Sequence, residues 1–523
     1  MRDRSRWTAF WVPFLLFSAL ASLWALASPI LSVPDENAHA TKAVAQLRGQ
    51  VIGEVVPGVK HLVVQLPDGY RYSPQIVCFA MAPDVTADCG VELGTSTGTN
   101  QFNTWVGAYN PVYYYVVGWP SLIFDGSAGI YAMRIASSLF CAMFFAWAWQ
   151  AGMAARRARW MPAGLAFAAV PMALYLAGSV NPNGVEIASA AALWVSVLRL
   201  LQTFGRDEDP DPFALPRPYL WSIVTLSSIV LVNARSLGPL WLFIVVGLCF
   251  VASGWDPVKA LFTRGSSYGW LAAIVAGGIF SVAWTLGGGA LSSQAEASDA
   301  SLVGGSFAQG FFHTLRYTPD YLKEAFITFG WLDTQLAPEI GWSVVAAFSV
   351  LVVLSVVAVD RRSVLVLCAI LVACLLVPAL VQGYSVHQTG IIWQGRYGLF
   401  LYLGIPFLGA WLLSRNGRAV VFISVRVTWI IAVLMGTFGV GAYLFVLHRY
   451  VAGFDTVLGA LWNAAKWQPP LGWLALTVAF SLISLVYIAW TGLTAHVLAR
   501  REDDILSEVR TSPELSTDAR DYA

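Results

Sequence analysis

Long apolar runs recur from one end of this chain to the other, and they limit its fold more than any other feature. Hydrophobic residues fill 57% of its 523 positions, charged residues fill only 12%, and the mean hydropathy is +0.65. A soluble domain usually has about 25% charged residues. The chain is therefore predicted to be an integral membrane protein that crosses the lipid bilayer many times.

The apolar runs can be counted against the hydrocarbon core of a bilayer, which a helix of roughly 17–25 residues crosses. Runs that approach this length lie at about 8–30, 134–154, 160–178, 185–204, 219–233, 237–253, 268–288, 340–358, 363–381, 397–413, 427–447 and 471–495. We predict an all-α, polytopic fold with about 12 transmembrane helices, in a range of about 11 to 13.

One further apolar segment, residues 110–124, decides whether this count is right. The segment is short, rich in Tyr, and carries Pro111 and Pro120 toward its two ends. These features favour a juxtamembrane helix in the membrane interface over a span. As a full span, it would place the basic cluster from Arg156 to Arg159 outside and invert every later loop.

Basic residues orient the chain, because Lys and Arg are retained on the cytoplasmic side of a membrane. With about 12 spans, most of the 31 Lys and Arg residues fall in the even-numbered turns, at the N-terminus and in the C-terminal tail. Both termini are then cytoplasmic. The two largest loops, at about 31–133 and 289–339, are external and hold the juxtamembrane helices.

This arrangement divides the chain into three parts. Residues 1–454 form the transmembrane domain with both external loops, residues 455–496 form a hairpin and the last transmembrane helix, and residues 497–523 form a disordered cytoplasmic tail. Acidic residues, Ser and Thr are frequent in the tail, as is typical of solvated segments.

Two of the six cysteines stand apart from the others. Cys78 and Cys89 fall in the first external loop, whereas the other four lie in apolar runs and are expected to be small hydrophobes. An oxidising compartment would let Cys78 and Cys89 form a disulfide. The alternative is two unpaired loop thiols.

Unusual polar residues gather at the external ends of the predicted spans, and they are candidates for binding a substrate. They are Asp35, Glu36 and His39 after the first span, Arg134 at the start of the second, Asn181 and Asn183 after the third, Asn233 and Arg235 after the fifth, Asp333 at the end of the second loop, and Gln394, Arg396 and Tyr397 before the tenth. In the predicted topology, all of them lie on one side of the membrane.

The three arginines of this set, Arg134, Arg235 and Arg396, occur where retention of positive charge inside should deplete them. Each can extend its guanidinium to lipid headgroups without further function. Each can also hold a phosphate with its forked donors. Their shared depth beside acidic residues favours an anionic, lipid-linked substrate.

The acidic motif at Asp35 and Glu36 allows three interpretations. The two carboxylates can be solvated residues at the start of a helix, stabilised by its dipole. One of them can be a general base that deprotonates an acceptor hydroxyl. Together with His39, which lies one turn after Glu36, they can also bind a divalent cation such as Mg or Mn.

Several familiar motifs are missing from the sequence. It contains no Walker loop and no His-Glu-x-x-His zinc motif. ATP-driven transport therefore has no support, and we expect no nucleic acid among the partners.

Four motifs together resemble a known family. They are Pro34-Asp35-Glu36 with His39, Asn110-Pro111-Val112-Tyr113-Tyr114, Phe329-Gly330-Trp331-Leu332-Asp333, and Gln394-Gly395-Arg396-Tyr397. The combination resembles the bacterial membrane family called domain of unknown function 2142, over roughly residues 10–450. That family is in turn similar to the C-type membrane glycosyltransferases, whose fold is called GT-C. One departure is Asn181-Pro182-Asn183, where many relatives have Asp.

The resemblance implies a transferase in a bacterial cytoplasmic membrane. Such an enzyme takes a sugar from a polyprenyl phosphate and gives it to an envelope glycan, lipid or protein on the extracytoplasmic side. The carboxylate that acts as base or metal ligand maps onto Asp35 or Glu36. The alternatives are a flippase or transporter of an envelope lipid, in which Asp35 does no chemistry, and a non-catalytic scaffold for envelope enzymes.

Overall fold

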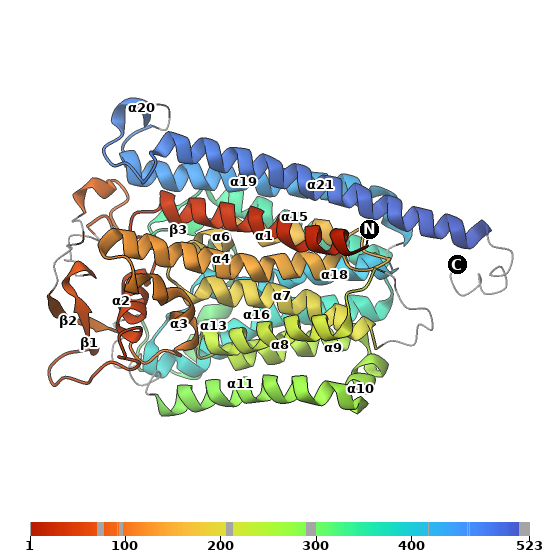
Figure 1. Cartoon of the computed structure of the whole chain (residues 1–523), viewed down its shortest axis with the longest axis horizontal. Helices are drawn as coiled ribbons and strands as arrows, with labels where there is room; N and C mark the ends of the chain where they lie inside the picture. The colour runs from red at the N-terminus through yellow and green to blue at the C-terminus, as the bar shows by residue number, and fades with distance from the viewer. Residues whose placement is uncertain are drawn as a thin grey trace.

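Long helices run side by side along the longest axis of the molecule (Figure 1). The computed structural model describes residues 2–70, 78–90, 93, 98–204, 213–288, 300–416, 418–457, 459 and 461–511. The chain is mostly helical, at 74%. The predicted helical class is confirmed, with two short β-ribbons in the loops as additions to it.

Each predicted apolar run is helical over most of its length. The corresponding elements are α1 (Arg2–Ala27), α4 (Gly126–Met153), α5 (Met161–Leu165) with η5 (Ala166–Ala169) and α6 (Pro171–Ala177), α7 (Pro182–Gln202), α8 (Arg217–Ala234), α9 (Gly238–Ser253), α11 (Tyr268–Gly287), α15 (Pro338–Ala358), α16 (Arg361–Thr389), α17 (Leu399–Tyr402) with α18 (Gly404–Asn416), α19 (Ser424–Ala452) and α21 (Trp473–Thr511).

The number of helices long and apolar enough to cross a membrane is somewhat lower than the predicted number of spans. In the part of the chain that the structure describes, nine helices qualify, and α9 would make a tenth together with α10 (Trp255–Thr263), to which it is bent by 116°. The other two predicted runs are α8, which has 18 residues, and the segment from α5 to α6. Pro171 interrupts that segment, because the residue before a proline avoids helical dihedrals.

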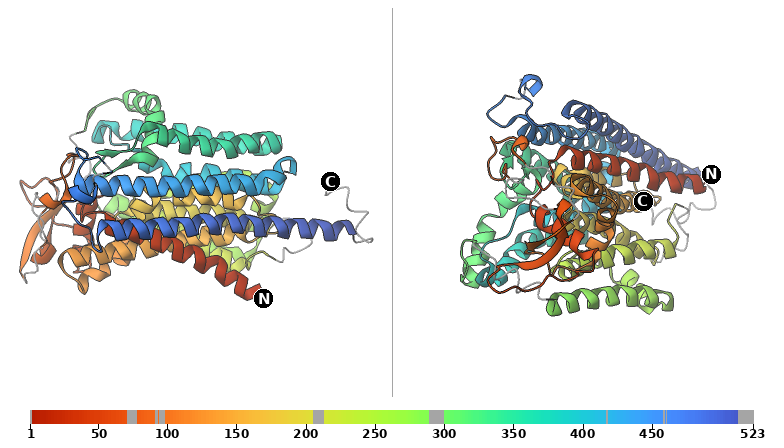
Figure 2. Two further views of the ribbon diagram at one scale, coloured as in Figure 1. Left: turned by 90° about the horizontal axis from the view of Figure 1, so that it is seen from above. Right: turned by 60° about the vertical axis from the view of Figure 1, so that its left-hand side comes forward.

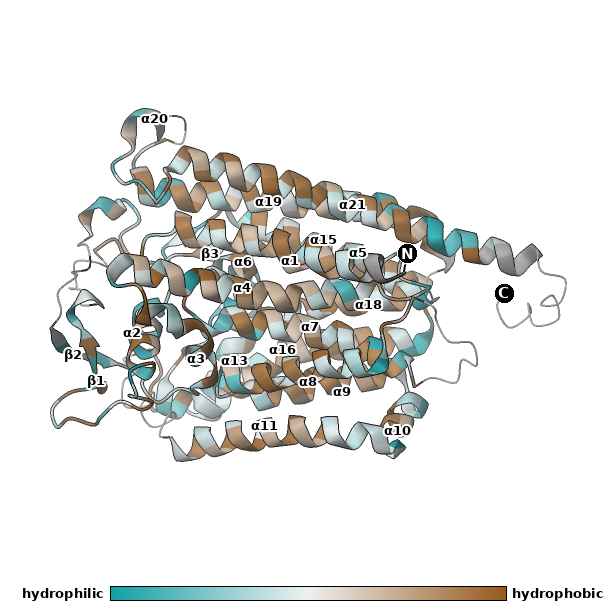
Figure 3. Cartoon of the chain, viewed as in Figure 1, coloured by the Kyte–Doolittle hydropathy of each residue, from teal (hydrophilic) through white to brown (hydrophobic). Residues whose placement is uncertain are grey.

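Burial differs sharply between the helices. In α7 every residue of the most apolar stretch is buried, whereas in α11 only 6% are. Figures 1 and 2 show α11 at the outer edge of the bundle in two different directions of view. Hydrophobic residues dominate the helices, and hydrophilic ones are frequent in loops and near the C-terminal end of α21 (Figure 3). Helix α7 is therefore surrounded by protein. Helix α11 leaves most of its apolar residues unburied, as is expected of a helix that faces the bilayer.

The first residues of α1 and the last residues of α21 lie at one end of the bundle, opposite the segment between α1 and α4 (Figures 1 and 2). We call the end that carries this segment, residues 28–125, the loop end. An even number of crossings places the termini together in this way. That the loop end is extracytoplasmic stays a prediction.

Short elements make up the loop end. They are α2 (Glu36–Gln46), β1 (Leu62–Pro67), η1 (Asp68–Tyr70), η3 (Ala87–Cys89), β2 (Thr99–Thr104), α3 (Val112–Gly118) and η4 (Trp119–Leu122). Strands β1 and β2 form an antiparallel ribbon in which Leu62 lies opposite Thr104. Because α3 has only seven residues, the prediction that residues 110–124 do not span the membrane is confirmed.

The second large loop returns to the same end. It contains α13 (Phe307–Arg316), α14 (Thr318–Ile327) and a minimal ribbon of β3 (Thr328–Phe329) with β4 (Thr334–Gln335). Part of this loop, residues 289–299, lies outside the described residues. Gly310 of α13 packs closely on Val386 of α16, so the helix lies against the bundle.

The predicted disordered tail needs a correction at its beginning. Helix α21 continues to Thr511, so residues 497–511 are helical. Arg159 holds this extension through ion pairs with Glu502 at 3.1 Å and with Asp503, and Arg501 donates to the carbonyl oxygen of Met153. These contacts with the α4–α5 connection stabilise a helix that composition alone did not predict. Residues 512–523 lie outside the described residues.

Candidate functional site

Asp35 begins helix α2 in an unusual conformation. Its φ of 66° is left-handed, which among residues with side chains Asp and Asn adopt most readily. The side chain makes no capping hydrogen bond to α2. Instead, its Oδ2 accepts a hydrogen bond from Nη2 of Arg396 at 3.0 Å. The Asp35 side chain is 32% exposed and that of Arg396 is 4% exposed.

The turn Gln394-Gly395-Arg396-Tyr397 positions Arg396 by packing on α14. Gly395 lies so close to this helix that a β-carbon would collide with the carbonyl oxygen of Tyr321. Only glycine fits there without a shift of the backbone. The close contact holds the 3-10 turn η7 (Gly395–Gly398), and Arg396 with it, at the loop end.

A second arginine lies beside the first. Arg235 follows the last residue of α8, and its Cζ is 4.3 Å from the centre of the Tyr397 ring, while that of Arg396 is 5.1 Å from the same ring. Both distances are in the range of cation–π contacts. We call Arg235 and Arg396 the arginine pair. Tyr397 therefore brings together two positive charges from distant parts of the sequence.

Helix α7 supplies the partners of Arg235. The side-chain oxygen of Asn183 accepts a hydrogen bond from Nη1 of Arg235. Glu186, one turn further along α7, places Oε2 4.0 Å from the same nitrogen. Nε1 of Trp241 donates to the other Glu186 oxygen at 2.9 Å, so this buried carboxylate is held in place.

His39 lies close to both members of the pair. Its Nδ1 is 2.8 Å from the hydroxyl oxygen of Tyr114. Burial, followed by the positive charges of Arg235 and Arg396, holds the pKa of His39 well below its ordinary value. A neutral imidazole is therefore favoured there.

Glu36, next to Asp35, points elsewhere. Its Oε1 accepts a hydrogen bond from Nε of Arg134 at 2.7 Å, and its Oε2 accepts a second one from Nη2. Both side chains are completely buried. The remaining N–H groups of Arg134 donate to the carbonyl oxygens of Ala25, Ser28 and Pro29. All five donors of Arg134 are thus used, and none remains for the predicted substrate.

Three other predicted site residues also bond to neighbouring groups of the protein. The amide of Asn181 donates to the carbonyl oxygen of Pro34 at 2.9 Å, and its oxygen caps α7. Asn233 accepts a hydrogen bond from Asn110 at 2.7 Å. Asp333 binds Arg449, with 3.0 Å between Oδ2 and Nη2. The structure therefore does not bring Asn233 and Asp333 to the arginine pair, and the Asn181 amide reaches the backbone beside Asp35 and not its carboxylate.

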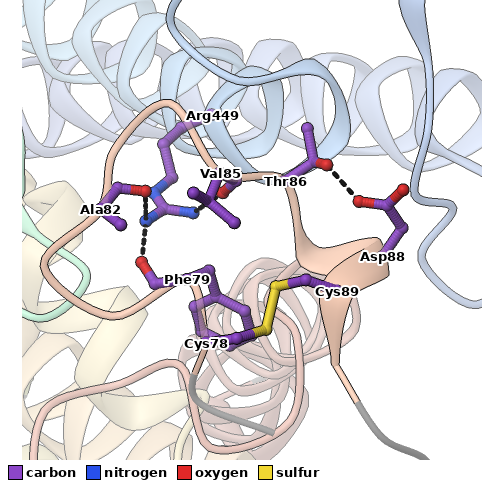
Figure 4. The surroundings of a disulfide bond; sticks show 8 residues. All are labelled: Cys78, Phe79, Ala82, Val85, Thr86, Asp88, Cys89 and Arg449. Carbon is purple, nitrogen blue, oxygen red and sulfur yellow. Dashed lines mark hydrogen bonds between the residues drawn. A yellow bond between two sulfur atoms is a disulfide. The ribbon is translucent and has the colours of Figure 1, made fainter. Parts of the chain in front are cut away.

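Arg449 is a fully buried charge that the sequence analysis missed. It donates to the carbonyl oxygens of Phe79, Ala82 and Val85, inside the loop that the Cys78–Cys89 disulfide closes (Figure 4). The signal was available, because an arginine at the external end of a predicted span is the feature that drew attention to Arg134. Glu186 also had a signal, since it lies on the same face of α7 as Asn183.

The proposed cation site does not fit this arrangement. Asp35 faces Arg396, Glu36 faces Arg134, and Nδ1 of His39 faces Tyr114. Among the described residues, no three His, Cys, Asp or Glu side chains are grouped so that they could hold a metal ion. The three predicted ligands therefore do not form a Mg or Mn site here.

Two buried polar atoms beside the pair lack a protein partner within the described part of the chain. They are Nε of Arg396 and Oε1 of Gln394. Native structures rarely leave buried polar atoms unpaired. A ligand with both acceptors and donors would satisfy them.

Fold and site together define a class: a polytopic helical membrane protein with an arginine pair and one partly exposed carboxylate at its loop end. A family described as predicted membrane protein (DUF2142) matches residues 17–405. The chain belongs to this family, and the predicted membership is confirmed. No curated protein matches the chain.

One solved structure is similar, the crystal structure of ArnT from Cupriavidus metallidurans in the apo state. It has 12% sequence identity and a TM-score of 0.40, with 95% of this chain and 77% of that chain covered. A similarity at this level carries no information on activity. The likeness to C-type glycosyltransferases in activity therefore stays a prediction.

Proposed function

We propose that this protein is a membrane glycosyltransferase that takes a sugar from a polyprenyl-phosphate donor and gives it to an envelope acceptor at the loop end, outside a bacterial cytoplasmic membrane. The observation that carries the proposal is the ion pair of Asp35 and Arg396. It sets a partly exposed carboxylate against an arginine that shares a tyrosine ring with a second arginine.

The arginine pair binds the donor phosphate in this proposal. Arg guanidinium groups match phosphate oxygens with forked donors. Arg396 has an unused Nε, and the Arg235 side chain is 23% exposed. As the bond between sugar and phosphate breaks, negative charge grows on the departing phosphate. Donors that are already in place stabilise this charge without reorganisation.

Asp35 is the general base. It removes the proton from an acceptor hydroxyl, whose oxygen attacks the anomeric carbon of the sugar. The bond from that carbon to the phosphate oxygen breaks, and the electron pair leaves with the phosphate. Glu36 and Glu186 are buried and held by other groups, whereas Asp35 is partly exposed and contacts Arg396 directly.

The remaining predicted residues receive supporting roles. Glu36, Arg134 and Asn181 hold the acidic motif against the bundle. Asp333 holds Arg449 and, through it, the disulfide loop. Asn183 orients Arg235, and His39 remains a neutral neighbour of both arginines.

A transporter of an envelope lipid is the second candidate. The buried contact of Glu186 with Arg235 favours it, because internal ion pairs often mark the path of a charged substrate. In a transporter, Arg235 and Arg396 bind phosphate, and Asp35 takes no part in chemistry.

Sugar release from labelled polyprenyl-phosphate sugars, measured with purified protein in lipid nanodiscs, separates the two candidates. A transferase releases the labelled sugar to an acceptor preparation and loses this activity in Asp35→Asn. A transporter moves the intact lipid across liposomes, and Asp35→Asn keeps that movement.

A further inference from the structure

The two arginine–carboxylate pairs at the loop end differ in how firmly they are held. Glu36 and Arg134 share two hydrogen bonds, and Val180 adds a third to Glu36 from its backbone N–H at 3.0 Å. Asp35 and Arg396 share one hydrogen bond, with Asp35 partly open to solvent. The second pair is therefore the one that can open without disturbing the bundle.

The backbone at Asp35 adds to this difference. A left-handed backbone conformation is unfavourable for a residue with a side chain, and the Asp35 side chain does not compensate by capping the helix that follows. The carboxylate lies against Arg396 and does not cap α2. The geometry thus keeps Asp35 aimed at the arginine pair.

In this placement the Asp35 carboxylate and an incoming phosphate compete for Arg396. A phosphate that approaches the pair needs the N–H groups of Arg396, and one of them, on Nη2, is taken by Asp35. While Asp35 binds Arg396, its Oδ2 is also engaged by this hydrogen bond and is not available to take up a proton. The same contact therefore both occupies the phosphate site and masks the base.

We propose that Asp35 is a displaceable occupant of the arginine pair, and that a bound phosphate ester releases it to act as base. The inference rests on the proposed function and deepens it: donor binding switches on the base, so an acceptor is deprotonated only when a donor is present. Glu186 does not move in this exchange, because Trp241 holds it in the bundle.

The displacement predicts that one substitution at the site strengthens phosphate binding. In Asp35→Asn the competing charge is gone, so the variant should bind farnesyl phosphate, a short prenyl phosphate, about three- to five-fold more tightly than the unchanged protein. This is the fold-change expected for a partly exposed ion pair. Isothermal titration calorimetry in nanodiscs gives the Kd directly. Asp35→Gly suits the positive φ and should show the same gain, which separates the effect from misfolding.

Three controls define the result. Asp84→Asn makes the same charge change at an exposed residue of the same loop and should leave the Kd unchanged. In an Arg396→Gln background, Asp35→Asn should give no further gain. Farnesol, which has no phosphate, should bind all variants equally, and inorganic phosphate should repeat the gain if the phosphate alone is recognised.

The possible outcomes distinguish a failure of this inference from a failure of the proposed function. An unchanged or weaker Kd in both Asp35→Asn and Asp35→Gly overturns the displacement, even if the protein transfers sugar. Equal gains with farnesol overturn it too, since the anion is then not what is bound. Tighter phosphate binding without sugar transfer under any condition supports the displacement and removes the transferase.

Discussion

The carboxylates of Asp35 and Glu36 are adjacent in the sequence and bind arginines from different parts of the chain. Asp35 reaches Arg396 before α17, and Glu36 reaches Arg134 in α4. One pair is partly exposed and has one hydrogen bond, whereas the other is buried and has two. Two adjacent residues thus differ in role: Asp35 is able to react, and Glu36 holds the fold.

The buried pair predicts a loss of stability in Glu36→Gln. Removing one partner leaves Arg134 as an uncompensated buried charge, which costs about 3–5 kcal/mol. We expect a clearly lower Tm of the purified protein in detergent, measured by fluorescence, and a much smaller change in Asp35→Asn. If Glu36→Gln keeps the full Tm but loses sugar transfer, Glu36 is the base and our assignment is wrong.

Much of the fold could be predicted, because hydropathy acts locally. Each apolar run is helical in the structure, and the segment at 110–124 was too short to cross a bilayer. The site could be predicted only in part. Asp35, Arg235 and Arg396 do meet, but nothing in the sequence separates Asp35 from Glu36. Their directions depend on the left-handed turn at Asp35 and on packing of α4 against α1.

The helical extension of α21 was missed for a related reason. Composition made residues 497–511 look like a solvated tail, and the ion pairs of Arg159 with Glu502 and Asp503 join residues that are far apart in sequence. Long-range contacts of this kind leave no local pattern.

The disulfide and Arg449 stabilise the same loop, so we expect the loss of either to lower the thermal stability of the protein. Replacing Cys78 and Cys89 with Ser opens a loop with a sequence separation of 11, which costs roughly 3 kcal/mol by loop entropy. It also loosens the carbonyl groups that bind Arg449. We expect the Tm to fall in Cys78→Ser/Cys89→Ser and in Arg449→Ala. Cys368→Ser, at an exposed free cysteine, is the control. Peptide mapping that finds both loop thiols free in oxidised protein would contradict the account.

The environment of His39 predicts a pH dependence of stability. Because burial and the arginine pair lower its pKa in the folded protein, the unfolded chain binds a proton more readily below about pH 6.5, the ordinary His value. The folded state therefore loses stability as the pH falls below that value. His39→Gln should flatten the decline in Tm between about pH 6.5 and 5. The exposed His387→Gln should not, and an equal effect of both would remove His39 as the cause.

The positions of the termini predict the topology. A reporter fused after Arg159 or Arg418 should be cytoplasmic, and one placed near Gly90 or Ser306 should be external. Both signals together test which side the loop end faces. A reporter after Arg159 that is external would place the arginine pair in the cytoplasm and overturn the proposed site of action.

The most direct test of the central proposal is the rate of sugar transfer in Asp35→Asn. The substitution keeps the shape of the side chain and removes its basicity, so transfer from a labelled polyprenyl-phosphate sugar should fall roughly 10²–10⁴-fold. Phosphate binding should persist in this variant and weaken in Arg396→Lys, which keeps the charge but loses the forked donors. Full transfer activity in Asp35→Asn would contradict the account, because Asp35 is the carboxylate that contacts Arg396.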